Sequence, residues 1–261
     1  MKVVIFCGGF GIRMGEATQR VPKPMIPIGG RPILWHIMRY YASWGHNEFI
    51  LCLGYRAEAI KEYFLSYNEA MSNDFVLSNG SRDIQLLSTD IEDWTITFVD
   101  TGMTSTIGER LKSVDSFIAP DETFLATYGD GLTDVPLDEM IGRFDESGKS
   151  VLFVAVRPTV NMHVVDASDD GVVRRVRDIT NSDIRINGGY FVMRRDVLDL
   201  IEPGDELVDE PCHRLIEREQ LIAYPYDGFW APMDTLKDAQ RLDELWNSGQ
   251  APWVRTRNTV A

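Results

Sequence analysis

Short apolar runs of strand length alternate with longer segments in which apolar residues recur at helical spacing, and this order constrains the fold more than any other feature. The strand-like runs lie at residues 3–6, 49–53, 95–99, 124–128 and 151–156. The helix-like segments lie at residues 32–44, 57–67, 108–117 and 136–144. A strand–helix–strand order places parallel strands in one sheet, because each helix returns the chain to the same edge. We therefore predict an α/β fold with a mixed, mainly parallel central sheet.

The second half of the chain is less regular. Strands are expected at residues 172–176, 189–193 and 221–226, and helices at 196–201, 210–219 and 235–246. The polar segment 73–93 contains Asn79-Gly80, a pair typical of tight turns, and predicts a hairpin or an insertion. No repeat, low-complexity tract or linker divides the 261 residues, so we expect a single domain.

Charge and cysteine content exclude several classes of protein. With 26 Lys plus Arg and 40 Asp plus Glu, the formal net charge is −14, which argues against nucleic acid or an anionic membrane as the main partner. The three cysteines, Cys7, Cys52 and Cys212, form no CxxC pair or Cys/His cluster, so a structural zinc site is not expected. No apolar run approaches 18 residues and no signal-peptide pattern is present, which favours a reducing cytoplasm.

A glycine-rich segment follows the first strand and reads Cys7-Gly8-Gly9-Phe10-Gly11-Ile12-Arg13-Met14. Glycines let backbone N–H groups approach a phosphate closely, and Arg13 can add charge-assisted hydrogen bonds. The segment lacks the Gly-Lys-Ser/Thr ending of a P-loop, and Met14 stands where a dinucleotide fingerprint needs glycine. A glycine-rich turn without a ligand stays open as an alternative.

Lys23 lies between Pro22 and Pro24. Proline restricts the backbone, so this lysine is suited to present a fixed positive charge to a phosphate. An ordinary exposed loop lysine is the alternative, and the glycine-rich segment together with Lys23 is more specific than either alone.

These motifs, taken together, resemble the signature of nucleotide-sugar pyrophosphorylases, and most closely that of glucose-1-phosphate cytidylyltransferases. The resemblance covers nearly the whole chain in order. It rests on Gly8-Gly9-x-Gly11-x-Arg13-Met14, Pro22-Lys23-Pro24-Met25, Pro32-Ile33-Leu34-Trp35-His36, Val99-Asp100-Thr101-Gly102, Arg110-Leu111-Lys112, Thr127-Tyr128-Gly129-Asp130-Gly131, Ile186-Asn187-Gly188-Gly189 and Gly228-Phe229-Trp230-x-Pro232-Met233-Asp234-Thr235-Leu236.

The resemblance implies a Rossmann-like nucleotidyltransferase fold and a reaction of CTP with a sugar-1-phosphate that gives a CDP-sugar and pyrophosphate. It implies a nucleotide-binding half at residues 1–135, an acceptor-binding half at 136–235, and a C-terminal helix and tail at 236–261. It also implies a homo-oligomer and a Mg²⁺ cofactor held by Asp130 and Asp234.

The remaining site residues follow from the same resemblance. Arg13 and Lys23 would be catalytic. The nucleotide would be bound by Gly8, Gly9, Gly11, Ile12, Arg13, Lys23, Ser105, Arg110, Gly129 and Asp130. The acceptor would be bound by Tyr128, His163, Arg177, Asp178, Asn187, Gly188 and Trp230.

The chemistry of these residues agrees with the implied reaction. The acceptor phosphate and the α-phosphate of CTP are both anionic, and Lys23, Arg13 and Mg²⁺ would cancel their repulsion. Mg²⁺ takes hard oxygen ligands, commonly one or two carboxylates together with phosphate oxygens. Other interpretations stay open, in which Asp130 is a turn residue and Asp234 is a helix cap.

The chain departs from the family pattern mainly on the acceptor side. Arg177, Asp178 and Ile179 stand where the family has Glu-Lys-Pro, and His163 replaces a glycine. On the nucleotide side the departures are Ile12 for threonine and Glu109 for glycine. We infer that nucleotidyl transfer is kept and that the acceptor differs from glucose-1-phosphate. The alternatives are transfer from UTP, dTTP, ATP or GTP, with Glu109 near the base, or a non-catalytic nucleotide-binding protein.

Overall fold

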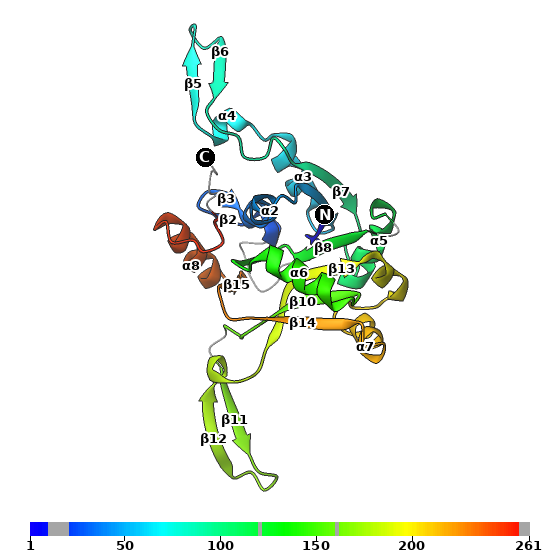
Figure 1. Cartoon of the computed structure of the whole chain (residues 1–261). Coiled ribbons are helices and arrows are strands. Elements are labelled where there is room, and N and C mark those ends of the chain that lie inside the picture. Colours follow the sequence, from blue (N-terminus) through cyan, green and yellow to red (C-terminus); the bar gives the residue numbers. More distant parts are fainter. Residues whose placement is uncertain (10–20, 120–121, 160–161, 256–261) are drawn as a thin grey trace.

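A computed structural model describes residues 1–9, 21–119, 122–159 and 162–255, and its centre is a seven-stranded sheet (Figure 1). The strand order is β14-β10-β13-β8-β1-β4-β7. The bounds are β14 Leu221–Tyr226, β10 Val151–Val156, β13 Ile186–Arg194, β8 Thr123–Tyr128, β1 Lys2–Phe6, β4 Glu48–Leu53 and β7 Thr95–Asp100. Only β13 pairs antiparallel with its neighbours, so the predicted mixed, mainly parallel sheet is confirmed.

The central strands form where the sequence is apolar at every position, because both faces of the sheet are covered. Along β1, Val3 and Ile5 face one hydrophobic core, whereas Val4 and Phe6 face the other. All four side chains are buried. This burial on both faces explains why the runs read as continuous apolar segments rather than as alternating ones.

Helices cover both faces of the sheet. The first core receives side chains from α2 (Ile33–Ser43), α3 (Ala57–Leu65), α6 (Leu137–Ser147) and α8 (Leu236–Asn247). The second receives them from α5 (Ile107–Ser113), the 3-10 helix η5 (Arg195–Leu200) and α7 (Glu210–Glu217). The predicted helices are confirmed with two differences: residues 108–117 divide into α5 and the short 3-10 helix η3 (Asp115–Phe117), and residues 196–201 form 3-10 rather than α-helix. No helix in the described part of the chain is long and apolar enough to cross a membrane.

The order of the strands reverses beside β1. β1 pairs with β4 on one side and with β8 on the other, both in parallel. Loops that leave neighbouring strands in opposite directions open a crevice at the carboxyl edge of a sheet, where α/β proteins bind ligands. The segment that begins with Gly8 and the turn at Gly129-Asp130 both start at this edge.

Two hairpins project from the body at opposite ends in Figure 1. The first arm consists of β5 (Phe75–Ser78) and β6 (Asp83–Leu86), and the second of β11 (His163–Ala167) and β12 (Val173–Asp178). In the first arm, Asn79 and Gly80 both have positive φ, which confirms the predicted hairpin turn. In the second, β12 was expected from its apolar residues, but β11 was not, because its sequence alternates only weakly.

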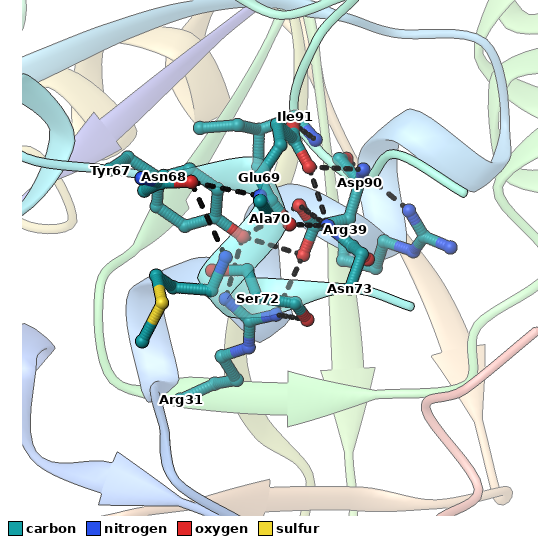
Figure 2. Close-up of polar contacts among 11 residues, drawn as sticks. Arg31, Arg39, Tyr67, Asn68, Glu69, Ala70, Ser72, Asn73, Asp90 and Ile91 are labelled. Carbon is teal, nitrogen blue, oxygen red and sulfur yellow. Dashed lines mark hydrogen bonds and ion pairs between the residues drawn. The ribbon is translucent and has the colours of Figure 1, made fainter. Parts of the chain in front are cut away.

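The first arm is anchored at its root by a polar network that Figure 2 shows. Arg31, in the short strand β3 (Arg31–Pro32, paired with β2, Pro27–Ile28), forms an ion pair of 3.0 Å with Asp90. The Tyr67 hydroxyl donates to both oxygens of the Asp90 carboxylate, and Asn73 of the loop after α4 (Glu69–Ser72) donates to Oδ1. The network joins Tyr67 and Asn73, which precede the first arm, and Asp90, which follows it, to Arg31 of the body.

Candidate functional site

Three side chains far apart in the sequence meet at the carboxyl edge of the sheet. Lys23 Nζ donates to Asp130 Oδ2 and to Asp234 Oδ1, each at 2.7 Å, across separations of 107 and 211 residues. The Lys23 side chain is 11% exposed, whereas the two carboxylates are about a third exposed. The lysine and both carboxylates that the resemblance singled out therefore form one cluster that opens to solvent on its acidic side.

The backbone fixes each member of this cluster. Lys23 begins the 3-10 helix η2 (Lys23–Met25), and Pro22 before it holds an extended conformation. Asp130 lies between β8 and β9 (Gly131–Thr133), and Asp234 follows β15 (Trp230–Pro232). β9 pairs with β15, and the Met233 N–H donates to the Asp130 carbonyl at 2.8 Å, so these two turns are joined side by side.

Asp234 is not the cap of the closing helix. Thr235 is the N-cap residue of α8, and its hydroxyl accepts from the Asp238 N–H in a capping box with the Asp238 side chain. The alternative interpretation of Asp234 as a helix cap was therefore wrong. Its carboxylate is left to face Lys23 because the neighbouring threonine takes the capping role.

The charges of the two aspartates decide the protonation of Lys23. Burial alone would lower the pKa of the ammonium, but the charge and hydrogen bond of Asp130, followed by those of Asp234, hold that pKa above its ordinary value. Lys23 thus stays a fixed cation at neutral pH, as the chemistry of approaching phosphates requires.

Arg110 lies beneath the loops instead of pointing into open space. It is 2% exposed, and its guanidinium donates to the carbonyls of Gly8, Leu53, Gly102 and Met103 and to the Thr101 hydroxyl. Leu53 is the last residue of β4, and the other acceptors lie in the segments that follow β1 and β7. Arg110 therefore holds the end of β4 and the loops after β1 and β7 together, and its predicted role in nucleotide binding stays a prediction.

At two of the predicted nucleotide-binding glycines, neighbouring atoms leave no room for a side chain. A Cβ on Gly8 would lie 2.0 Å from Arg110 Nη1, and a Cβ on Gly129 would lie 2.9 Å from the Phe6 carbonyl oxygen. Among the described residues, a Cβ on Gly9 would meet nothing within 4 Å. The predicted contact of Gly9 with a phosphate stays a prediction. Gly11, Ile12, Arg13 and Met14 lie outside the described residues, and their predicted roles stay predictions.

Ser105 and Glu109 both serve the local structure. The Ser105 hydroxyl donates to the Thr101 carbonyl at 2.5 Å. The Glu109 carboxylate accepts from the Thr106 N–H, as part of a capping box at the start of α5, and from the Gly204 N–H, both at 3.0 Å. The departure from the family at Glu109 therefore caps a helix and ties it to a distant loop, and its predicted influence on the choice of base stays a prediction.

A cavity of about 240 Å³ adjoins the cluster. Asp130 and Asp234 are two of its lining residues. The other lining residues are Thr127, Tyr128, Gly131, Thr159, Ile186, Asn187, Gly188, Gly189, Tyr190, Trp230 and Pro232. Among the lining residues that the structure describes, the charged ones are the two aspartates.

Hydrogen bonds within the cavity wall fix its shape. Trp230 Nε1 donates to the Gly188 carbonyl at 2.7 Å, and Asn187 Oδ1 accepts from the Gly189 N–H at 2.8 Å. Gly189 has a φ of +77°, and a Cβ there would lie 2.3 Å from the Tyr128 ring. The structure thus brings together four of the predicted acceptor-binding residues: Tyr128, Asn187, Gly188 and Trp230.

The other three predicted acceptor-binding residues, His163, Arg177 and Asp178, lie on the second arm and are not among the lining residues. His163 is the cross-strand partner of Asp178 at the root of the arm. The Asp178 carboxylate accepts from the N–H and hydroxyl of Thr180. The role of these three residues in acceptor binding stays a prediction.

The predicted site residues leave out seven residues of the cavity wall: Thr127, Gly131, Thr159, Ile186, Gly189, Tyr190 and Pro232. Thr159 lies just beyond the end of β10, and Pro232 ends β15. A signal was present, since residues just beyond strand ends at a switch point are the ones that face a ligand crevice. His36 of α2 belongs to the core and not to the site: it is 1% exposed, and its Nε2 is 2.8 Å from the Ile28 carbonyl oxygen.

Comparisons with known proteins agree with the site. A family model described as nucleotidyl transferase matches residues 2–231. The chain is 41% identical over 255 residues to glucose-1-phosphate cytidylyltransferase of Salmonella typhi, which covers 97% of this chain and 98% of that protein. It is 40% identical over 255 residues to the probable glucose-1-phosphate cytidylyltransferase of Bacillus subtilis (strain 168), which covers 97% and 99%.

The fold is also found in crystal structures of more distant proteins. The putative glucose-1-phosphate thymidylyltransferase of Bacillus anthracis superposes with a TM-score of 0.69 at 14% identity, over 98% of this chain and 97% of that one. HddC of Yersinia pseudotuberculosis superposes with a TM-score of 0.64 at 18% identity, over 94% and 99%. At these identities the likeness confirms the predicted Rossmann-like fold.

Proposed function

The chain belongs to the nucleotidyl transferase family and is a nucleotidyltransferase, and on this premise we propose that it transfers a cytidylyl group from CTP to a sugar-1-phosphate or a sugar-like phosphate. The observation that carries the proposal is the cluster of Lys23 between Asp130 and Asp234, beside a cavity of sugar size. The full-length likeness to two cytidylyltransferases supports CTP as the donor.

The proposed reaction needs no side-chain nucleophile. A phosphate oxygen of the acceptor forms a bond to the α-phosphorus of CTP, the bond from that phosphorus to the β-bridging oxygen breaks, and pyrophosphate leaves with the electron pair. Lys23 supplies a fixed positive charge where the two anionic groups meet, which lowers their repulsion and the energy of the charged transition state.

Asp130 and Asp234 fit the ligand chemistry of Mg²⁺. Both offer carboxylate oxygens, and Lys23 engages one oxygen of each. Among the described residues there is no group of three or more His, Cys, Asp or Glu suited to a metal, so phosphate oxygens of the substrates would complete the coordination. When bound, the ion would neutralise phosphate charge and align the reacting groups.

Asp130→Asn tests this assignment. One carboxylate charge is removed, so we expect the Mg²⁺ concentration needed for half-maximal turnover to rise about tenfold or more. The measurement is pyrophosphate release as a function of Mg²⁺ for the variant and the wild type. An unaltered Mg²⁺ response would remove Asp130 from the ligand set.

We further propose that the acceptor differs from glucose-1-phosphate. Two departures support it: Asp178 stands where the resemblance leads one to expect a phosphate-binding lysine, and His163 stands where it leads one to expect a glycine. The cation that holds the acceptor phosphate must then come from Lys23 or from the second arm, where Arg177 lies.

The test crosses five nucleoside triphosphates (CTP, UTP, dTTP, ATP and GTP) with a panel of sugar-1-phosphates and related phosphates, and measures pyrophosphate release with Mg²⁺. We expect release with CTP and the highest kcat/KM with an acceptor other than glucose-1-phosphate. Glucose-1-phosphate as the best acceptor would refute the altered acceptor but keep the transfer. Release with another triphosphate alone would refute the choice of CTP, and CTP binding without release from any pair would favour a non-catalytic nucleotide-binding protein.

A homo-oligomer is part of the proposal. Each arm carries large apolar side chains that are more than a third exposed, among them Val76, Leu77 and Ile84 in the first and Val165 and Val176 in the second. An isolated two-stranded hairpin is marginally stable in water, and exposed apolar strands invite association. Closed symmetric assembly of identical chains is the commonest way to cover such surfaces.

Light scattering of the purified chain tests the assembly. We expect a mass that is a multiple of the 29.6 kDa chain, and a lower mass for Leu77→Lys. Leu65→Lys, at an 84% exposed position outside the arms, is the matched control and should leave the mass unchanged. A single-chain mass for the wild type at micromolar concentration would contradict the proposal.

A further inference from the structure

An exposed carboxylate outside the cavity holds together the two chain segments that enter and leave the second arm. Asp227 Oδ1 accepts from Arg157 Nε at 2.9 Å and from Arg185 Nη2 at 3.0 Å, and Oδ2 lies 3.1 Å from Arg185 Nη2. The Asp227 side chain is 62% exposed. No catalytic or lining role explains why two arginines converge on it.

The three residues extend one row of the sheet. Val156 pairs in register with Ile186 on one side and with Tyr226 on the other. Arg157 and Asp227 directly follow β10 and β14, and Arg185 directly precedes β13. Their side chains thus tie three adjacent strands at the edge where the cavity lies.

Further bonds from the arginines reach the backbone of the same region. Arg185 Nη1 donates to the carbonyls of Ala155 and Tyr226, each at 3.1 Å. Arg157 Nη1 donates to the carbonyl of the buried Ser182 at 2.7 Å. Asp227 orients both guanidinium groups, and each guanidinium then fixes the main chain at one end of the arm.

The fixed segments continue directly into the cavity wall. Arg157 is two residues before Thr159, and Arg185 is followed by Ile186 and Asn187, all three of which line the cavity. Asn187 in turn accepts from the Gly189 N–H beside Tyr128. A change at the exposed carboxylate would therefore reach the cavity wall at Thr159, Ile186 and Asn187.

We propose that Asp227 is a positioning residue for the acceptor: through Arg157 and Arg185 it sets the distance between Thr159 and Ile186–Asn187 across the cavity. This inference rests on the proposed function, because it assigns the wall formed by Thr159 and Ile186–Asn187 to the sugar part of the acceptor. The carboxylate stays charged under assay conditions, since Arg185 and then Arg157 hold the pKa of Asp227 below its ordinary value.

The matched control is Asp199, at the opposite end of β13. It is equally exposed at 61%, and Arg195 Nη1 approaches both of its carboxylate oxygens at 3.1–3.2 Å, with Lys112 nearby at 3.9 Å. Asp199 follows the carboxyl end of β13, whereas the cavity lies at the amino end. Its loss removes a similar ion pair without touching the cavity wall.

The experiment compares Asp227→Asn, Asp227→Glu and Asp199→Asn by pyrophosphate release, using the acceptor and triphosphate that serve the wild type best. For Asp227→Asn we expect the acceptor KM to rise about three- to fivefold, with kcat and the triphosphate KM within about twofold. Asp227→Glu, which keeps the charge, should restore at least half of the loss. Asp199→Asn should change none of these constants.

Hydrogen exchange gives a second readout that needs no activity. In Asp227→Asn, amides of residues 182–187 should exchange faster than in the wild type. The amides of residues 66–93, which contain the first arm and its root, should exchange at the wild-type rate. A similar rise of both KM values, no rise in the acceptor KM, or no change in exchange at residues 182–187 would overturn the positioning role. Wild-type protein without pyrophosphate release would refute the proposed function instead, and the exchange measurement would still decide whether Asp227 fixes these segments.

Discussion

The two arms are attached to the body in different ways. The root of the first arm is buried: Asp90 is 7% exposed and binds Arg31, Tyr67 and Asn73 (Figure 2). The root of the second arm is held at the surface, where Arg157 and Arg185 share Asp227. Both are arginine–aspartate links, but their surroundings differ.

We expect this difference to separate effects on the free energy of unfolding from effects on acceptor binding. Removing one partner of a buried ion pair leaves an uncompensated charge in a poorly solvated place, whereas water replaces the partner at an exposed one. None of the four residues in the buried network lines the cavity, while the exposed link is continuous with its wall. Substitutions at the root of the first arm should therefore lower the free energy of unfolding. Substitutions at the root of the second arm should instead weaken acceptor binding.

We expect the largest effect on activity from a substitution of Lys23, which should leave the fold intact. Lys23→Ala removes the cation between the two carboxylates, and we expect kcat to fall about 100- to 1000-fold. The free energy of unfolding, measured with urea, should change by about 1 kcal/mol or less, because both carboxylates remain in contact with water. Activity near that of the wild type would exclude Lys23 from the mechanism.

Asp90→Asn should disrupt the polar network at the root of the first arm. We expect the free energy of unfolding to fall by about 3 kcal/mol, because the half-buried Arg31 loses its counter-ion. Asp227→Asn should lower the free energy of unfolding far less in the same urea titration, because water replaces its partners at this exposed position. Equal destabilisation by the two substitutions, or a raised acceptor KM in folded Asp90→Asn, would refute the separation of roles.

Acidification should weaken the body beside the first arm. Burial and, to a smaller extent, the charge of the nearby Arg31 lower the pKa of His36 to about 4, although the hydrogen bond with the Ile28 carbonyl opposes them. In the unfolded chain the pKa is the ordinary 6.5, so the unfolded state binds more protons between these values and stability falls as the pH drops from 6.5 towards 4. The total is about 2–3 kcal/mol.

Urea titrations at pH 7.5 and pH 5 measure this loss. His36→Gln lacks the titrating group and should lose less stability over that interval than the wild type. The same loss in both proteins would show that other groups cause the pH dependence.

The smallest expected effects concern the turns of the arms. Gly80 in the first arm and Gly171 in the second both have positive φ, so alanine at either position costs about 1 kcal/mol locally. Hydrogen exchange should quicken only in the substituted arm, and the global midpoint of unfolding should stay almost constant. A global loss from Gly80→Ala would show that the first arm is part of the cooperative core.

Much of the fold follows from local sequence. Val3 to Phe6 are apolar at every position because both faces of β1 are buried, and this pattern is visible without a structure. The Asn79-Gly80 turn follows from the backbone freedom of these residues. The second arm was half missed because a ribbon without a core carries no strong apolar pattern.

The candidate site divides in the same way. The sequence by itself determined the stiff setting of Lys23 between two prolines and the place of Asp130 after a buried strand, because both depend on neighbours in the chain. Only the tertiary structure decided that Asp234 faces Lys23, and that Arg110 and Glu109 turn to backbone groups. The physical reason is that a charged side chain binds whichever partners the sheet and its loops bring within about 3 Å, and chain folding, not spacing along the sequence, sets those distances.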